Sequence, residues 1–308
     1  MDFGPHLILA MLEGLVQASV LTLTALGLSL VFGVMRVVNV AHGEFFMLGA
    51  VFAYGVASWL GGHAAVGFVA ALIIAPLLVG VLAVASDWLI LRRLDYDPER
   101  TIVATIGILY VIQQVTLMTY GPDAHPVEPP FNHRLAIPWF EFTGNGLEFY
   151  YPWGLSTTSY KLFVVAAASF CGLLIWLLMT RSRLGLILRA TQLDRETALA
   201  FGIPVERVYA FVFGLGAAVA ALGAVLIVPI QQAHYLMGHD PLLLSFIVVI
   251  IGGLGSLRGT AVAAILIGMS NGIISVFFSP TLAKILATLL VAFVLVYRPQ
   301  GLFGTKPA

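Results

Sequence analysis

Long apolar stretches separated by short polar ones dominate the pattern of residues along the chain. A helix that crosses a bilayer needs about 20 consecutive apolar residues. Runs of this kind cover roughly 7–32, 45–60, 64–91, 101–119, 161–180, 208–230, 260–278 and 281–297, and a shorter run covers 242–255. The pattern predicts eight or nine hydrophobic segments, and we expect 45–60 and 242–255, the two shortest, to be interrupted or re-entrant helices.

Composition supports this pattern. Hydrophobic residues make up 60% of the 308 residues and charged residues only 10%, whereas soluble domains carry about 25% charged residues. A soluble enzyme, a nucleic-acid-binding protein and a disordered chain are therefore excluded. A transmembrane barrel would show short alternating segments instead. We predict an all-α polytopic integral membrane protein with one transmembrane domain, residues 1–308, whose first segment is retained because no basic residue precedes it.

The distribution of basic residues predicts the orientation of the segments. Cytoplasmic loops carry an excess of Lys and Arg. Arginines crowd 92–100 and 181–207, and Arg298 and Lys306 follow the last apolar run. We expect these regions and the C-terminus to be cytoplasmic. The loop 120–160, which is more acidic than basic, is expected to be external, and the N-terminus then also lies outside.

Two glycine-bearing interruptions form a weak internal repeat, one at 38–43 and one at 253–259. In transporters, such breaks line a cavity in which the freed backbone groups meet solute. The alternative is that small residues simply allow close helix contacts. The candidate pathway residues at the two breaks are Asn39, His42, Gly43, Glu44, Gly253, Gly255 and Ser256.

Polar residues inside apolar runs are costly and usually face a pathway or another helix. Glu13 lies about two turns into the first run, Asn271 lies within the run 260–278, and Gln113 and Gln114 lie in the run 101–119. Each of them either contacts solute or joins two helices. We expect Asp87 to pair with Arg92 or Arg93.

The segment 181–207 predicts a short helix of about ten residues. Thr191 followed by Asp194 resembles a helix start, and Gly202 followed by Pro204 is a stop signal. Such a helix either fits a groove on a partner protein or lies on the membrane surface. The residues expected to carry the contact are Asp194, Arg195, Glu196, Ala198, Leu199, Phe201 and Gly202.

No sequence pattern for nucleotide or metal chemistry is present. None of the three lysines follows a glycine-rich phosphate-binding turn, so no hydrolytic site and no cofactor are expected in this chain. The histidine pair His125 and His133, and the group His234, His239 and Asp240, do not share a predicted helix face, so a metal site is not expected.

Four segments resemble one family. Residues 27–50 are similar to the first signature of the branched-chain amino-acid permease family, and 252–259 and 298–304 match two of its other recurrent patterns. Glu196-Thr197-Ala198 with Gly202 resembles the Glu-Ala-Ala loop of bacterial ABC-importer permeases, with Thr197 at a position where alanine is usual. The resemblance covers nearly the whole chain and is greater to the H-type permease subunit than to its longer M-type partner.

This resemblance implies an assembly in the bacterial inner membrane. A second permease subunit, related or identical, would complete the translocation pathway. Two cytoplasmic ATPase subunits would bind ATP and dock on 181–207, which becomes the coupling loop. An external solute-binding protein would meet 120–160, whose aromatic residues alternatively form an interfacial belt. Lipid surrounds the chain, and no nucleic acid is expected.

The function expected from these observations is that of a permease subunit in an ABC importer for an amino acid, branched-chain or otherwise hydrophobic. The same family also includes importers of urea, amides and aromatic acids. Two other classes are alternatives. An ion-coupled secondary transporter would bury several carboxylates or histidines, and Glu13 is the obvious candidate here. A membrane-embedded enzyme would cluster catalytic residues at one depth, whereas the polar residues here are scattered.

Overall fold

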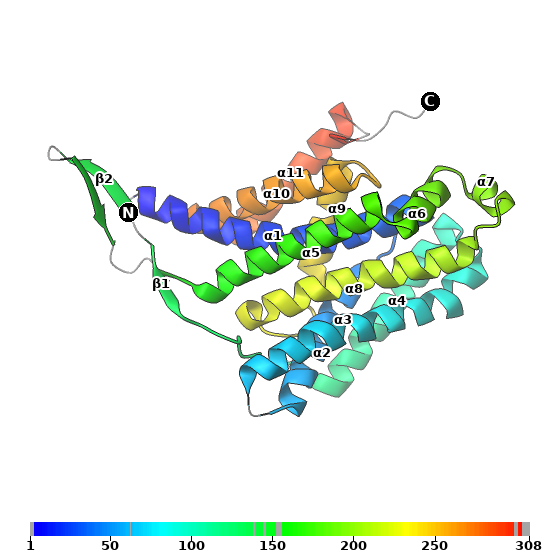
Figure 1. The fold of residues 1–308 in the computed structure, drawn as a ribbon, viewed down its shortest axis with the longest axis horizontal. Helices are drawn as coiled ribbons and strands as arrows, with labels where there is room; N and C mark the ends of the chain where they lie inside the picture. Colours follow the sequence, from blue (N-terminus) through cyan, green and yellow to red (C-terminus); the bar gives the residue numbers. More distant parts are fainter. Residues whose placement is uncertain are drawn as a thin grey trace.

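The computed structural model describes residues 3–61, 63–137, 139–143, 146–151, 156–298 and 301–303. The described chain forms an elongated bundle in which most helices run roughly along the longest axis (Figure 1). Its helices are α1 (Phe3–Met35), α2 (His42–Trp59), α3 (Ala64–Leu89), α4 (Pro98–Tyr120), α5 (Ser159–Arg181), α6 (Arg183–Leu193), α7 (Arg195–Ala200), α8 (Val205–Gln231), α9 (His239–Gly252), α10 (Leu257–Phe277) and α11 (Pro280–Tyr297), with a 3₁₀ turn at Leu91–Leu94.

Seven helices in the described part of the chain are long and apolar enough to cross a membrane, namely α1, α3, α4, α5, α8, α10 and α11. The prediction of a polytopic all-α membrane protein is confirmed. The two segments predicted to be short correspond to α2, with 18 residues, and α9, with 14. At 1.5 Å per residue α9 is only about 21 Å long, which is less than the hydrocarbon thickness of about 30 Å.

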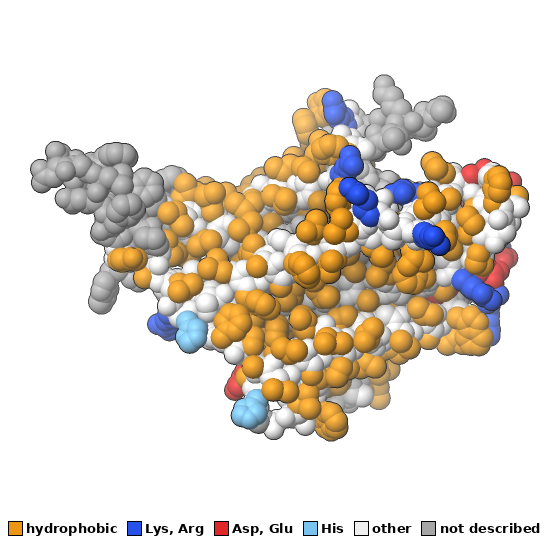
Figure 2. All heavy atoms as spheres, in the orientation of Figure 1, with side chains coloured by type: hydrophobic (Ala, Val, Ile, Leu, Met, Phe, Trp, Pro, Cys, Tyr) orange, Lys and Arg blue, Asp and Glu red, His pale blue; other side chains and the backbone are white. Residues whose placement is uncertain are grey.

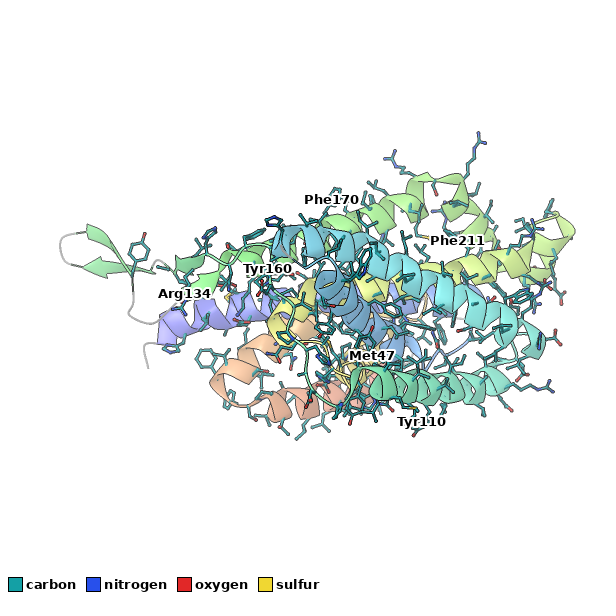
Figure 3. All side chains as sticks on the ribbon, turned by 90° about the horizontal axis from the view of Figure 1, so that it is seen from below. Met47, Tyr110, Arg134, Tyr160, Phe170 and Phe211 are labelled. Atoms are coloured by element: carbon teal, nitrogen blue, oxygen red, sulfur yellow. The ribbon has the colours of Figure 1, made fainter. Side chains whose placement is uncertain are left out.

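The centre of the bundle is built from α1 and α8, each with 78% of its most apolar stretch enclosed by the rest of the chain. Small residues let these helices approach closely. A Cβ built on Gly27 of α1 would lie 2.4 Å from the carbonyl oxygen of Gly216 in α8. Figure 3 shows Met47 in the middle of the bundle, whereas Tyr110 on α4 and Phe170 on α5 lie at its surface.

The two short helices begin inside the bundle and not at its ends. After α1 the chain turns back through residues 36–41, and α2 begins at His42, whose Nε2 lies 2.9 Å from the carbonyl oxygen of Thr24 in the middle of α1. A Cβ built on Gly43 would lie 2.4 Å from the carbonyl oxygen of Gly238, directly before α9. The N-terminal ends of α2 and α9 therefore meet in the interior (Figure 1).

Between α4 and α5 the chain forms four short strands that the sequence analysis did not predict. β1 (Arg134–Ala136) pairs with β4 (Ser156–Thr158), and β2 (Trp139–Thr143) pairs with β3 (Gly146–Tyr150), both antiparallel. These strands lie at one end of the bundle, and α6 and α7 lie at the other (Figure 1). The segments 120–160 and 181–207 thus occupy opposite ends, as their charges predict.

Candidate functional site

A cavity of about 350 Å³ lies beside the point where α2 and α9 meet. Side chains from α1, α2, α8, α9, α10 and α11 line it. Val20, Leu21, Phe46 and Ile227 make part of its wall apolar. Its polar lining consists of Gln17, Thr24, Gln231, His234, Asp240, Asn271, Ser275 and Lys284. The cavity therefore presents both aliphatic surface and hydrogen-bonding groups.

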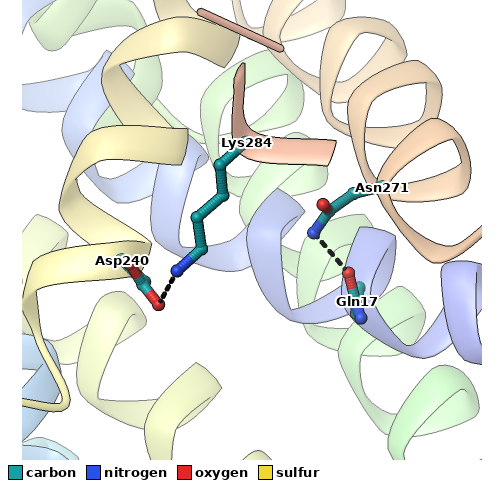
Figure 4. A network of polar contacts seen from close by, with 4 residues as sticks. All are labelled: Gln17, Asp240, Asn271 and Lys284. Atoms are coloured by element: carbon teal, nitrogen blue, oxygen red, sulfur yellow. Dashed lines mark hydrogen bonds and ion pairs between the residues drawn. The ribbon is translucent and has the colours of Figure 1, made fainter. Parts of the chain in front are cut away.

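Two polar contacts join the helices around this cavity (Figure 4). The Lys284 ammonium donates to the Asp240 carboxylate at 2.7 Å, and the Asn271 amide donates to Gln17 Oε1 at 2.6 Å. The Oδ1 atom of Asn271 is buried without a hydrogen-bond partner. A buried unpaired acceptor costs free energy, so the Asn271 amide is held in the cavity wall at a cost in stability.

The sequence analysis named only one of these four residues as a pathway candidate. Asn271 stands out as an amide within an apolar run, whereas Gln17 and Lys284 were not chosen and Asp240 was considered only for a metal. Lys284 lies four residues into the apolar run 281–297, and a charge inside a span is the signal that identifies it.

The candidate residues of the first break are deeply buried. Asn39 accepts a hydrogen bond from the Ala41 backbone through its Oδ1 at 3.0 Å, which holds the turn before α2. His42 is fully buried, and its Nδ1 has no partner, although its Nε2 contacts the Thr24 carbonyl oxygen. These two side chains therefore position the start of α2 next to α1.

Glu44 lies in the first turn of α2 and is 1% exposed. Its Oε1 is 3.7 Å from Nε2 of His239 in the first turn of α9, and that nitrogen is 3.0 Å from the side-chain nitrogen of Gln113 on α4. The second carboxylate oxygen of Glu44 is buried without a partner. The sequence named Glu44 and Gln113 separately; the packing brings them to the same histidine. Gln114, the other candidate on α4, is exposed.

The glycines of the second break make close backbone contacts. Gly253 and Gly255 have positive φ angles of 100° and 78°, which favour glycine. A Cβ built on Gly255 would lie 2.9 Å from Cα of Gly33 in α1. Ser256 caps α10, because its Oγ accepts from the Gly259 backbone at 3.2 Å. Small residues at these positions let α1 and α10 approach closely. The packing therefore requires small residues there, whether or not they line the pathway.

Glu13 does not line the cavity. It forms an ion pair with Lys161 that joins α1 to α5. The expected pairing of Asp87 with Arg92 or Arg93 is wrong: Asp87 accepts a hydrogen bond from the Tyr96 hydroxyl at 3.4 Å, and Arg92 pairs with Glu206 at 2.5 Å. The chain turns at 91–97 and brings Tyr96, which the sequence analysis did not consider, over the Asp87 carboxylate.

The segment 181–207 forms two helices instead of the one predicted. Thr191 does not cap a helix; it lies inside α6, and its Oγ1 donates to the Ile187 carbonyl oxygen at 3.0 Å. Asp194 is the cap of α7, accepting from the backbone of Glu196 at 2.9 Å and of Thr197 at 3.2 Å. The helix after this cap has six residues and not about ten.

The electrostatics of Asp194 follow from this capping geometry. Its carboxylate also accepts from the Thr197 hydroxyl at 2.5 Å. The hydrogen bonds from Thr197, side chain first, hold the pKa of Asp194 below its ordinary value. The ionised form is the one that caps the helix, so α7 is most stable when Asp194 is charged.

The apolar side chains of this segment project from the end of the bundle. Phe201 is 83% exposed and Leu199 49%, whereas Ala198 is buried. Gly202 has a φ of 80°, in agreement with the predicted helix stop. The Arg195 guanidinium lies 5.8 Å from the centre of the Tyr209 ring on α8. Arg195 thus fastens α7 to the bundle, while Glu196, Leu199 and Phe201 remain accessible.

Two further sequence predictions concern a metal site and the aromatic residues of the loop 120–160. Among the described residues, no group of three or more His, Cys, Asp or Glu side chains is arranged to hold a metal ion. In the loop 120–160 Tyr151 is exposed. Of the other aromatic residues expected to form a binding-protein contact or an interfacial belt, Trp153 lies outside the described residues, and the structure describes only the backbone of Trp139, Phe140, Phe142, Phe149 and Tyr150.

The helices, the short interrupted segments and the cavity between them define a multi-pass membrane permease. Residues 10–295 match the family described as the permease component of the branched-chain amino acid transport system. The chain belongs to this family, as its sequence patterns indicate.

Three relatives in sequence agree with this assignment. The chain is 26% identical to the high-affinity branched-chain amino acid transport system permease protein LivH of Salmonella typhimurium, over 96% of this chain and 94% of that one. It is 25% identical to LivH of Escherichia coli K12 over the same shares, and 26% identical to BraD of Pseudomonas aeruginosa over 97% and 96%. The solved structure of PsaBC from Streptococcus pneumoniae in complex with Fab covers 94% of this chain, with a TM-score of 0.48 and 13% identity.

Proposed function

We propose that this chain forms half of the translocation pathway of an ABC importer for a branched-chain or related hydrophobic amino acid. The observation that carries the proposal is the cavity at the junction of α2 and α9. Membership of the permease family and the names of its relatives support the class of solute.

The chemistry of the cavity suits a zwitterion with an aliphatic side chain. Helix N-termini carry partial positive charge and favour a carboxylate. The paired Asp240 carboxylate and Lys284 ammonium, 61% and 43% exposed at their side chains, offer opposite charges to the two charged groups of the zwitterion. Phe46 and Leu21 offer apolar surface to the side chain of the solute. The cavity volume of 350 Å³ lies at the lower end of the range of about 300–1,000 Å³ that is typical of ligand pockets.

The energy for transport then comes from separate ATPase subunits that dock on α7. The exposed Phe201 and Leu199 are the apolar groups available for this contact, and Glu196 adds a charge. A second permease subunit completes the pathway, and an external solute-binding protein meets the strands after α4. In this arrangement α7 and the C-terminus face the cytoplasm of a bacterium, and the chain lies in its inner membrane.

One observation favours a different energy source. Glu44 is a buried carboxylate beside His239, and buried acids of this kind are proton carriers in ion-coupled transporters. The proposal assigns Glu44 instead to the positioning of α2 against α9. The source of energy is therefore the first property to measure.

The test is reconstitution of the chain with its second permease and ATPase subunits in proteoliposomes. We expect leucine-loaded binding protein to stimulate ATP hydrolysis and uptake, and a protonophore to leave uptake unchanged. A catalytically inactive ATPase subunit is the control and should abolish uptake. Uptake that proceeds without ATP and stops when the proton gradient is removed would show that the protein is an ion-coupled transporter and not part of an ABC importer. ATP-driven uptake of an amide or urea in preference to leucine would correct only the proposed solute and would leave the importer assignment in place.

A further inference from the structure

A second feature of the fold lies away from the cavity described above. An apolar groove of about 470 Å³ runs between α1, α5 and α10. Figure 1 shows α5 and α10 on either side of α1, and Figure 2 shows that the middle of this face is largely apolar. Residues that line the groove include Leu26, Gly172, Leu173, Val262 and Ile265.

Two of the three hydroxyl groups that line this groove form hydrogen bonds within α1. Ser19 Oγ donates to the Leu15 carbonyl oxygen and Thr22 Oγ1 to the Ala18 carbonyl oxygen, both at 2.7 Å. Each bond closes within α1, so the groove presents little polar surface that needs water or a polar partner. Its lining is therefore compatible with a hydrocarbon chain.

The length of the groove matches one leaflet of a bilayer. Along α1 it extends from Leu15 to Leu26, which corresponds to about 16 Å at 1.5 Å per residue. Half of the hydrocarbon thickness of a bilayer is about 15 Å. An acyl chain that lies in the groove would place its headgroup at the end nearest α6.

A smaller pocket of about 260 Å³, which two arginines help to line, lies at that end of the groove. It shares Trp176, Leu257 and Arg258 with the groove, and it adds Arg189 and Ser256. The two cavities therefore adjoin each other. Arg189 is half-buried and donates to the Met179 carbonyl oxygen at 2.5 Å, which fixes its guanidinium at the pocket. Within the described part of the chain, neither Arg189 nor Arg258 forms an ion pair.

We propose that the groove and this pocket together bind an anionic phospholipid. One acyl chain lies between α1, α5 and α10, and the phosphate lies between Arg189 and Arg258. Basic pockets between membrane helices are suited to anionic headgroups, and the adjoining leaflet-long groove favours a lipid over a free phosphate ion. The site adjoins Gly255 and Gln192, so a bound headgroup contacts the second break and the end of α6. This inference does not depend on the identity of the transported solute.

The test is native mass spectrometry of the purified full-length protein with phosphatidylglycerol or phosphatidylcholine of identical acyl chains. We expect the wild type to bind phosphatidylglycerol more tightly. The double variant Arg189→Gln with Arg258→Gln should lose about fivefold in affinity per arginine and bind both lipids equally. The control replaces Arg93 and Arg100, exposed arginines outside this pocket, by glutamine and should retain the preference.

A second variant tests the groove without altering charge. A Cβ on Gly172 would meet only Leu26 Cδ1, at 3.9 Å, and a Cβ on Gly107 of α4 would meet nothing within 4 Å. Gly172→Phe should fill the groove and weaken binding of both lipids, and Gly107→Phe is the matched control.

Three results would overturn the proposal. The first is equal phosphatidylglycerol binding by the wild type and the double arginine variant. The second is inorganic phosphate that binds as tightly as the lipid and is indifferent to Gly172→Phe, which indicates a free-anion site. The third is efficient cross-linking of Val262→Cys, in a Cys171→Ala background, to a neighbouring subunit of the assembled transporter, which indicates that protein covers the groove.

Discussion

The guanidinium of Arg36 donates a hydrogen bond to the backbone carbonyl oxygen of Gln192, with a distance of 3.2 Å between Nη2 and the oxygen. Arg36 is the first residue after α1, at the start of the break that leads into α2, and Gln192 is the second-last residue of α6. The side chain of Gln192 also contacts the other break, since a Cβ built on Gly255 would lie 3.0 Å from its Nε2. The segment that precedes α7 therefore contacts both breaks.

We predict that this contact transmits motion of α7 to the pathway. Arg36→Gln should reduce uptake severalfold and abolish stimulation of ATP hydrolysis by the binding protein, while basal hydrolysis and ATPase retention remain. Arg36→Lys, which keeps a donor of similar reach, should restore part of the stimulation. Arg93→Gln serves as the control. Unchanged uptake in Arg36→Gln would show that the hydrogen bond has no role in coupling.

The close contact between Gly43 and Gly238 predicts that any side chain larger than that of glycine at position 43 destabilises the protein. Gly43→Ala introduces a Cβ within 2.4 Å of a backbone oxygen, and overpacking of this kind costs about 1–3 kcal/mol. Gly107→Ala, in open space on α4, should instead stabilise by up to about 1 kcal/mol through helix propensity. Thermal unfolding in detergent compares the two variants. Equal melting temperatures would mean that α2 and α9 separate easily.

The depressed pKa of Asp194 predicts a pH dependence for α7. Because the folded pKa lies below the ordinary value of 3.8, the cap is fully present above that value and is lost as the pH falls through the folded pKa. A spin label at exposed Ala200, in a Cys171→Ala background, should become more mobile only below about pH 4. Asp194→Asn, which caps without titrating, should remove this dependence. The same transition in Asp194→Asn would assign it to another group.

The Asp240–Lys284 ion pair predicts that its loss reduces transport much more than it reduces the stability of the protein. Both side chains are substantially exposed, 61% and 43%, and exposed pairs contribute about 0.2–1 kcal/mol to stability. Lys284→Met should therefore change the melting temperature little but lower uptake strongly, because it leaves the Asp240 carboxylate alone at the cavity. The exchange of the two residues should recover part of the uptake. Full activity of Lys284→Met would exclude the pair from the pathway.

The orientation of the bundle is testable with single cysteines. In a Cys171→Ala background, Arg183→Cys on α6 and Glu128→Cys after α4 are both exposed positions. We expect a membrane-impermeant maleimide to label Glu128→Cys in intact cells and Arg183→Cys only after permeabilisation. Labelling of both from outside would contradict the predicted topology.

Hydrophobic patterning predicted the spanning helices and the two short segments because span length depends on local sequence. It did not predict the contacts around the cavity. Gln17 and Asn271 are 254 positions apart, and no local sequence pattern indicates that α1 and α10 lie side by side. The sequence alone also could not decide whether Thr191 or Asp194 caps the helix. Both residue types are acceptable caps, and Asp194 takes the role because Thr191 lies inside α6 and bonds to the backbone of that helix. The strands after α4 are only three to five residues long, too short for a clear alternation.

The interior start of α2 has a consequence for biosynthesis. His42 and Glu44 are enclosed largely by α1, by α8 and by the first turn of α9, and the latter two are translated more than 150 residues later. A nascent chain that stops before α8 would expose these polar side chains to lipid, where they are costly. We expect α2 to settle in the bilayer only after the second half of the chain has left the ribosome. Truncated chains would then be recognised and degraded by membrane proteases.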